Sequence, residues 1–227
     1  MQPGLETEVC ESSAVLVVAL GVLAGLLALV DWYAVVRDRR ELETWAKPAT
    51  LAGLTATTVA AGALDASAGR WLVAALLLGL LGDVALLGRS NRRFLLGLTA
   101  FLLGHLAYVV CFLVLGVEEG WWMVVGAGVV VVAFLVGREV LPAAVAHGGK
   151  GFGAAVATYM CVIGATTVTG WATALPLVAA GTAVFVASDT TLALDRFVAA
   201  RPHGRIAVMV TYHVGQALIA AGVLLAL

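Results

Sequence analysis

Long apolar runs separated by short polar segments fill nearly the whole chain, and this pattern predicts membrane-spanning helices. A helix needs ~20 apolar residues to cross the ~30 Å hydrocarbon core of a bilayer, and shorter or tilted helices extend that range. The second and fifth runs are the shortest. We expect eight transmembrane helices, at residues 13–36, 49–64, 71–87, 94–115, 121–136, 152–169, 172–194 and 206–225.

The connections between these runs are too short to form another domain. The longest covers residues 137–151 and is rich in Gly, Ala and Pro, which indicates a loop. Apolar residues make up 62% of the chain and charged residues 12%, about half the charge of a soluble domain. We therefore expect one all-α membrane domain over residues 1–227.

The charged residues are distributed unevenly between the two sides of the predicted bundle. The first, third, fifth and seventh connections hold 12 of the 13 basic residues, and only Arg70 lies on the other side. The positive-inside rule then places these four connections in the cytoplasm and both termini outside it. The basic residues are Arg37, Arg39, Arg40, Lys47, Arg89, Arg92, Arg93, Arg138, Lys150, Arg196, Arg201 and Arg205, and acidic residues on the opposite side are Glu6, Glu8, Glu11, Glu118 and Glu119.

Four other features of the sequence bear on the processing, metal binding, partners and source of the protein. The first apolar run follows an acidic tail, unlike a cleavable signal peptide, so we expect this helix to remain. Cys10, Cys111 and Cys161 lack the close spacing of a disulfide framework or a thiolate metal site. Basic loops favour anionic lipid headgroups, and no nucleic-acid partner is expected. Arg-rich, Lys-poor composition with much Ala, Val and Gly is typical of a GC-rich bacterial genome, so we expect a bacterial cytoplasmic membrane protein.

Asp83 and Asp189 lie inside apolar runs, about four and five residues before the predicted cytoplasmic helix ends, which is ~6 Å or slightly more. Each follows a small residue and precedes a Leu by three positions, so the two share one frame and one depth. A charge at this depth costs a few kcal/mol and indicates a functional site. The structural alternative is that one bonds a neighbouring helix while the other reaches the interface.

The fourth run places Phe101, His105 and Tyr108 at four- and three-residue steps, so the three share one helix face. Gly97 and Gly104 on this helix allow a neighbouring helix to approach closely. The polar positions indicate either substrate contacts or an interhelical hydrogen bond made by His105.

In the eighth run, Tyr212 and Gln216 share a face and are expected to line a pocket, whereas His213 points away. Lys47 precedes Pro48, a residue typical of a first helical turn, so we expect the second helix to begin there. Lys47 would then lie at the cytoplasmic interface, as a phosphate ligand or as a topological anchor.

A weak internal duplication is also present. Lys47 to Asp83 spans 36 residues and Lys150 to Asp189 spans 39, which would give two parallel repeats of four helices. Asp31, beside Trp32 and outside this pattern, is expected to be an interfacial anchor or an ion-pair partner.

Taken together, four segments resemble the YhhN-type membrane proteins, a family that includes the eukaryotic lysoplasmalogenases, over most of the chain. The segments are Lys47-Pro48; Gly82-Asp83 with Phe94-Leu-Leu-Gly-Leu-Thr-Ala-Phe101, Gly104-His105 and Tyr108; Phe185 and Ser188-Asp189 with Leu192-Ala-Leu; and Thr211-Tyr212, Gln216 and Leu218-Ile219. His213 departs from the pattern, which more often has an aromatic or apolar residue there.

The resemblance implies an eight-helix hydrolase that cleaves the vinyl ether bond of lysoplasmalogens, releasing a fatty aldehyde and a glycerophospho-ethanolamine or glycerophospho-choline. It implies that Asp83 and Asp189 are catalytic. Two carboxyls in an apolar site tend to share one proton, so one can act as an acid while the other stabilises an oxocarbenium-like ion and orients water. No metal or cofactor is required. Supporting contacts to a lysophospholipid entering from the cytoplasmic leaflet are expected from Lys47, His105, Tyr108, Ser188, Tyr212 and Gln216.

Three alternatives use the same residues. The first is a zinc-dependent lipid hydrolase, whose metal ligands would be His105, His213, Asp83 and Asp189. Ser188 as a nucleophile is weaker, because adjacent helical residues diverge. Paired acids and a His in a parallel repeat are also compatible with a small proton-coupled transporter.

Overall fold

The computed structural model describes residues 3–88, 90–118 and 120–227, with side chains from residue 13 onward. Arg89, Glu119 and the side chains of Glu6, Glu8, Cys10 and Glu11 lie outside the described residues. Over the described ranges the chain forms eight α-helices and one 3₁₀ turn, without a strand, as expected for an all-α protein. The elements are α1 (Pro3–Val36), α2 (Arg40–Ala60), η1 (Ala63–Asp65), α3 (Ser67–Leu86), α4 (Asn91–Leu115), α5 (Trp121–Val136), α6 (Val140–Ala172), α7 (Pro176–Phe197) and α8 (Gly204–Leu224).

Six of these helices are long and apolar enough to cross a membrane: α1 from Ser13 onward, α3, α4, α6, α7 and α8. Helix α5 is apolar but has only 16 residues. Helix α2 does not qualify, because Arg40, Glu41, Glu43 and Lys47 make its first two turns polar. The expectation of eight spans therefore holds for six helices, and the two exceptions are the two shortest predicted runs.

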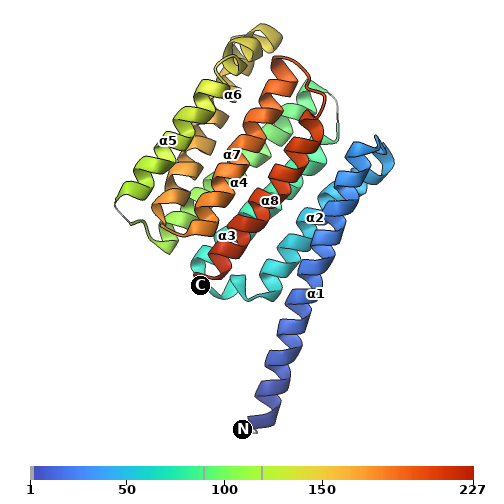
Figure 1. The fold of residues 1–227 in the computed structure, drawn as a ribbon, viewed down its shortest axis with the longest axis vertical. Helices are drawn as coiled ribbons and strands as arrows, with labels where there is room; N and C mark the ends of the chain where they lie inside the picture. Colours follow the sequence, from blue (N-terminus) through green and yellow to red (C-terminus); the bar gives the residue numbers. More distant parts are fainter. Residues whose placement is uncertain (1–2, 89, 119) are drawn as a thin grey trace.

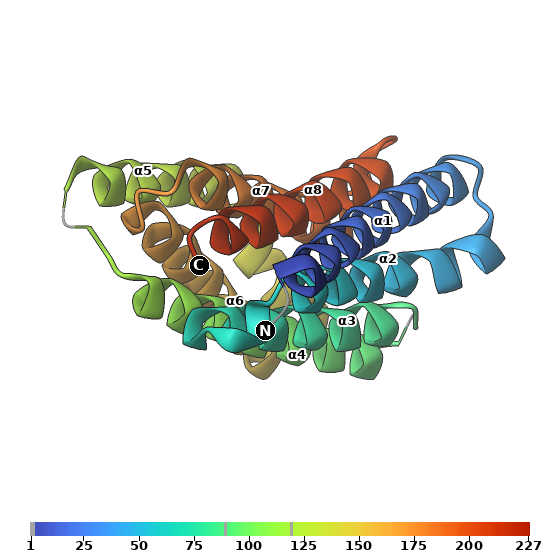
Figure 2. The same cartoon turned by 90° about the horizontal axis from the view of Figure 1, so that it is seen from below.

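The helices pack in two layers, which are seen end-on in Figure 2. One layer has the order α5, α7, α8, α1, and the other has the order α6, α4, α3, α2. Contacts between sequential helices α1–α2 and α5–α6 join the layers at the sides, and α6–α7 and α3–α8 join them in the middle. In Figure 1 the connections after α1, α5 and α7 lie at the end of the bundle opposite the C-terminus. We call it the basic end, because it carries the Arg-rich connections.

Several helix boundaries differ from those predicted from the sequence. Helix α2 begins at Arg40 rather than at Pro48, which lies inside the helix. Acidic residues in its first turn, Glu41 and Glu43, favour this earlier start because they stabilise the positive end of the helix dipole. The segment 140–151, predicted as loop, is helical except for a kink at Gly149, whose φ of 79° suits glycine.

Helix α7 was expected to begin near residue 172. Helix α6 instead continues to Ala172, and α7 begins at Pro176. Proline lacks the backbone N–H that the first turn leaves unpaired, so this position suits it. Asp189 consequently lies about two turns before the end of α7 at Phe197.

Close approach of α3 and α4 depends on the glycines expected from the sequence. A Cβ added to Gly104 would lie 3.2 Å from the carbonyl oxygen of Ala75, and one added to Gly97 would lie 2.7 Å from the Leu86 side chain. The short separation lets the two helices carry Asp83 and His105 into one interior region.

Candidate active site

A cavity of about 130 Å³ lies inside the bundle and is lined by side chains from seven of the eight helices, α2 to α8. Its polar lining includes both aspartates singled out from the sequence, Asp83 on α3 and Asp189 on α7. The polar lining also includes Lys47, Tyr159, Ser188, Thr190 and Tyr212. Most of the remaining lining is apolar. Two carboxyls therefore border one largely apolar space.

Asp83 is completely buried and is held by two neighbours from different helices. The Lys47 ammonium on α2 lies 3.1 Å from Oδ1, and the Tyr212 hydroxyl on α8 donates a hydrogen bond of 2.9 Å to Oδ2. Lys47 is itself enclosed, with 8% of its side chain exposed. It was expected at the interface; instead its charge is paired inside the protein. An ion pair and a phenol donor both favour the ionised form of Asp83.

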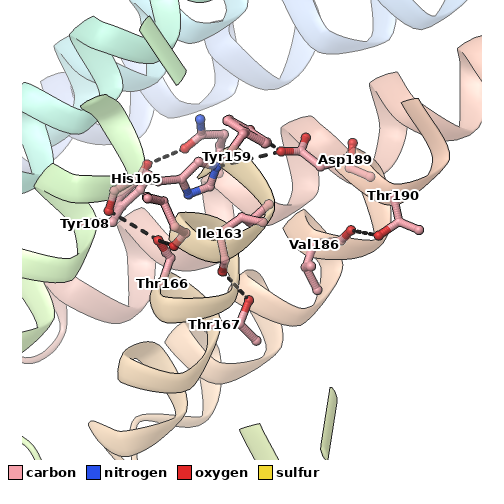
Figure 3. Close-up of polar contacts among 12 residues, drawn as sticks. His105, Tyr108, Tyr159, Ile163, Thr166, Thr167, Val186, Asp189 and Thr190 are labelled. Atoms are coloured by element: carbon pink, nitrogen blue, oxygen red, sulfur yellow. Dashed lines mark hydrogen bonds and ion pairs between the residues drawn. The ribbon is translucent and has the colours of Figure 1, made fainter. Parts of the chain in front are cut away.

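Asp189 has a parallel arrangement with different partners, as Figure 3 shows. The Tyr159 hydroxyl on α6 donates a hydrogen bond to Oδ2, and His105 Nε2 on α4 lies 3.8 Å from the same oxygen. His105 is 2% exposed, and neither ring nitrogen forms a hydrogen bond with a described residue. Lys150, which the proposed duplication aligned with Lys47, is exposed on α6. The residue beside Asp189 is thus an imidazole rather than an ammonium.

The other predicted polar residues take supporting positions. Tyr108 on α4 donates a hydrogen bond to Oε1 of Gln216 on α8, and both are buried. Ser188 lines the cavity but donates its hydroxyl proton to the carbonyl oxygen of Val208 on α8, at 3.0 Å. Tyr108 and Gln216 are absent from the cavity lining. They join α4 to α8, and Ser188 joins α7 to α8.

His213 and Asp31 lie apart from the cavity lining. His213 Nδ1 accepts a hydrogen bond of 3.0 Å from the Trp32 indole, consistent with its predicted direction away from Tyr212 and Gln216. Asp31 was expected at the interface; it is instead completely buried in α1, and neither oxygen has a hydrogen-bond partner among the described residues.

Tyr159 was not identified from the sequence, although it is the hydroxyl donor to Asp189. A signal was available, because Tyr159, Ile163 and Thr166 recur at four- and three-residue steps along α6, as Phe101, His105 and Tyr108 do along α4. This stripe faces α4, since the Thr166 hydroxyl donates a hydrogen bond of 3.2 Å to the His105 carbonyl. Two helix faces with the same spacing and with polar residues at membrane depth could have indicated that α4 and α6 meet.

The ligand set considered for zinc does not assemble. Among the described residues, no group of three or more His, Cys, Asp or Glu side chains is close enough to hold a metal ion. His105 lies beside Asp189, whereas His213 is bonded to Trp32 on α1. The arrangement instead places two carboxyls, two phenols and one ammonium on the lining of an apolar space, with the His105 imidazole beside Asp189 but outside that lining. Such a set of groups suits proton transfer to and from a bound organic molecule.

Comparison with known sequences gives one match. A sequence model described as the YhhN family matches residues 42–223, which is most of the chain and covers α3 to α7 together with almost all of α2 and α8. Searches of curated proteins and of solved structures gave no match. The matched range contains both aspartates and all four of their neighbours described above, whereas Asp31 and Trp32 lie before it. The chain belongs to the YhhN family.

Proposed function

We propose that this protein hydrolyses the vinyl ether bond of a lysoplasmalogen-like lysophospholipid within the membrane, using Asp83 and Asp189. The observation that carries the proposal is that both carboxyls line one apolar cavity, each bonded by a tyrosine hydroxyl and accompanied by a basic side chain. Membership of the YhhN family supports this reaction class.

The two carboxyls have unequal surroundings, and we assign them different roles. Asp83 is paired with the Lys47 ammonium, so it remains a carboxylate and stabilises positive charge that develops on the substrate. Asp189 lines the cavity and has 14% of its side chain exposed. Tyr159 and His105 both lie at its Oδ2, which leaves Oδ1 to carry the proton. Asp189 is therefore the general acid of the proposal.

The reaction balances with one water molecule. Asp189 transfers its proton to the alkenyl carbon farther from the ether oxygen, and the resulting cation is shared by the adjacent carbon and that oxygen. Water adds to the carbon that is bonded to the ether oxygen, and the proton that water loses returns to Asp189. The hemiacetal then collapses with proton transfer to the glycerol oxygen, giving an aldehyde and a glycerophosphodiester. The sequence of steps parallels the charge development of glycoside hydrolysis.

The cavity lining also offers a place for the fatty chain. On α5 it includes Val130, Ala133 and Phe134, and the Phe134 side chain is exposed on the outer surface of the bundle. Apolar residues of α6, among them Ile163, continue this wall. A chain lying here would enter from the lipid side, with its polar end toward the basic end of the bundle. The positive-inside rule would place that end in the cytoplasm.

The deciding experiment is aldehyde release by detergent-purified protein given alkenyl and acyl lysophospholipids. We expect aldehyde from the alkenyl lipid only, and a loss of at least about 100-fold in both Asp83→Asn and Asp189→Asn, the range that acid–base catalysis supplies. Asp31→Asn is the matched control, because it neutralises a third buried aspartate outside the cavity lining. Aldehyde release that survives in both cavity variants would refute the two-carboxyl mechanism.

The same samples address the transporter alternative. A proton-coupled carrier would acidify or alkalinise the lumen of proteoliposomes when substrate is added, and it would release no aldehyde. Substrate-dependent proton flux without hydrolysis would therefore replace the hydrolase proposal.

A further inference from the structure

A second cavity of about 260 Å³ lies at the basic end and adjoins the first one. Lys47, Leu86, Phe94, Leu192, Val208 and Met209 line both, so the two spaces share a wall. We call this second space the arginine cavity, because Arg40, Arg196 and Arg205 line it together with Glu43 and Asp195. A molecule that extends from one space to the other has its apolar part near the aspartates and its polar part here.

Most of the positive charge in the arginine cavity is already paired within the protein. Lys47 is bound to Asp83, and Arg205 donates to Asp38 at 2.9 Å and to Glu43 at 2.7 Å. Arg40 donates to the carbonyl oxygen of Leu87 at 2.9 Å. Each of these three side chains therefore already binds an acceptor within the protein.

Arg196 differs from them, because its guanidinium is held against a ring and one of its unused donors is buried. Its Nη2 donates to Asn91 Oδ1 at 3.1 Å, and its guanidinium lies over the Phe94 ring with 4.4 Å to the centroid. Its Nε is buried and has no acceptor among the described residues. A guanidinium held flat with a free N–H is a favourable ligand for a phosphate oxygen.

Asp195, the residue before Arg196, has a carboxylate oxygen without a hydrogen-bond donor among the described residues. Its Oδ1 is buried and accepts no hydrogen bond from a described residue, although Nη1 of Arg201 lies 4.0 Å away. Its Oδ2 packs against the first residue of α8, where a Cβ on Gly204 would come within 1.5 Å. The carboxylate is thus held in one position with an unfilled acceptor. A buried acceptor of this kind is stabilised by an N–H donor rather than by a cation that has no N–H.

We propose that the arginine cavity binds the headgroup of a phospholipid that carries a primary amine, with the phosphate at Arg196 and the ammonium at Asp195. A quaternary ammonium has no N–H to give to Asp195, and a glycerol headgroup has no cation. The cavity therefore selects an ethanolamine-type headgroup over a choline-type or glycerol-type one. In assigning this lipid as the reactant, the inference rests on the proposed function.

The test separates binding from reaction by using alkyl ether lysophospholipids, which lack the vinyl ether and cannot release aldehyde. Binding of ethanolamine, choline and glycerol forms to purified protein is measured by calorimetry. We expect the ethanolamine form to bind about tenfold more tightly than the other two, the size expected for one charged hydrogen bond. Asp195→Asn, which loses the charge but keeps an acceptor oxygen, should reduce this preference, Asp195→Glu should keep more of it, and Arg196→Gln should weaken binding of all three lipids about tenfold.

Arg92→Gln is the matched control, because Arg92 is an exposed arginine of α4 at the same end and outside the cavity lining, and it should change nothing. Free glycerophosphoethanolamine distinguishes a lipid from a soluble ligand. It should bind at least tenfold more weakly than the lipid, since it lacks the buried chain. Equal affinity of the two would overturn the assignment to a lipid headgroup, and unchanged preference in Asp195→Asn would overturn the assignment of Asp195.

The two experiments distinguish failure of the headgroup proposal from failure of the hydrolase proposal. Headgroup preference without aldehyde release from alkenyl lipids would leave the arginine cavity as a lipid site and reject the hydrolase. Aldehyde release without headgroup preference would support the hydrolase and reject the arginine cavity as a site that selects ethanolamine headgroups.

Discussion

The Lys47 ammonium lies 3.1 Å from Oδ1 of Asp83, and both side chains are enclosed between α2, α3 and α8. Removing two ions from water is costly, and a buried pair of this kind is maintained only when each partner remains. The pair joins a residue near the basic end of the bundle to one of the two carboxyls of the cavity. It therefore links the stability of the fold to the charge of the candidate active site.

Lys47→Met should be strongly destabilising, because it leaves the Asp83 carboxylate buried and opposite an apolar side chain. Loss of one partner of a buried pair costs about 3–5 kcal/mol, which should appear as a lower melting temperature in detergent. Combining Lys47→Met with Asp83→Asn should recover much of that loss while hydrolysis remains absent. A single variant that melts like the unmodified protein would contradict the ion pair.

Tyr159→Phe and Tyr212→Phe should reduce activity with little effect on folding, because each removes one hydroxyl and leaves its ring. The two hydroxyls donate to Asp83 and to Asp189, which becomes charged as it transfers its proton, and a hydrogen bond to a charged group contributes about 1.5–3 kcal/mol. We expect kcat for aldehyde release to fall about 10- to 100-fold in each variant. Tyr33→Phe, at an exposed position on α1, is the control and should leave kcat unchanged.

The sequence could predict the membrane class, the order of the helices along the chain and the position of Asp83 and Asp189 inside apolar helices. The equal depth expected for the two was not borne out by the helix ends, because Asp83 lies less than one turn before the end of α3 and Asp189 about two turns before the end of α7. The sequence could not predict the neighbours of these residues. Helical periodicity shows which residues share a face, but the order of helices within the two layers decides which faces meet. Lys47 and Tyr212 reach Asp83 only because α2 and α8 both pack against α3.

Local signals also failed where tertiary structure overrode them. The dipeptide Lys47-Pro48 has the features of a helix start, yet the polar turns before it are helical and place Lys47 inside the protein. Segment 140–151 has the composition of a loop, yet it is helical apart from the kink at Gly149. In both cases packing contributes more than intrinsic propensity, which is worth only ~1 kcal/mol per residue.

His105→Phe should separate the packing role of His105 from its chemical role. The ring packs edge-on against Phe185 with 4.8 Å between centroids and against Tyr159 with 5.7 Å, and phenylalanine keeps these contacts. Its two nitrogens make no hydrogen bond with the described residues, so their loss should not lower the melting temperature. We expect at least a tenfold loss of aldehyde release if the imidazole assists proton transfer at Asp189. Full activity in a folded variant would leave His105 as a packing residue only.

Gly82→Ala should impair the site without touching a carboxyl. A Cβ at Gly82 would lie 2.6 Å from the Phe101 ring, which packs edge-on against Tyr212 with 5.8 Å between centroids. Displacing Phe101 would move Tyr212 and weaken its hydrogen bond to Asp83, so we expect about a tenfold or greater loss of aldehyde release, because catalysis is sensitive to small displacements.

Two further variants decide whether crowding is the cause of that loss. Gly128→Ala, on the open face of α5 where nothing lies within 4 Å of the new Cβ, should keep full activity. Gly82→Ala combined with Phe101→Leu should regain activity, because the smaller and more flexible leucine makes room for the added methyl group while Tyr212 returns to Asp83. If the combined variant is less active than Gly82→Ala alone, Phe101 itself contributes to the site, and displacement of Tyr212 by crowding is not the explanation.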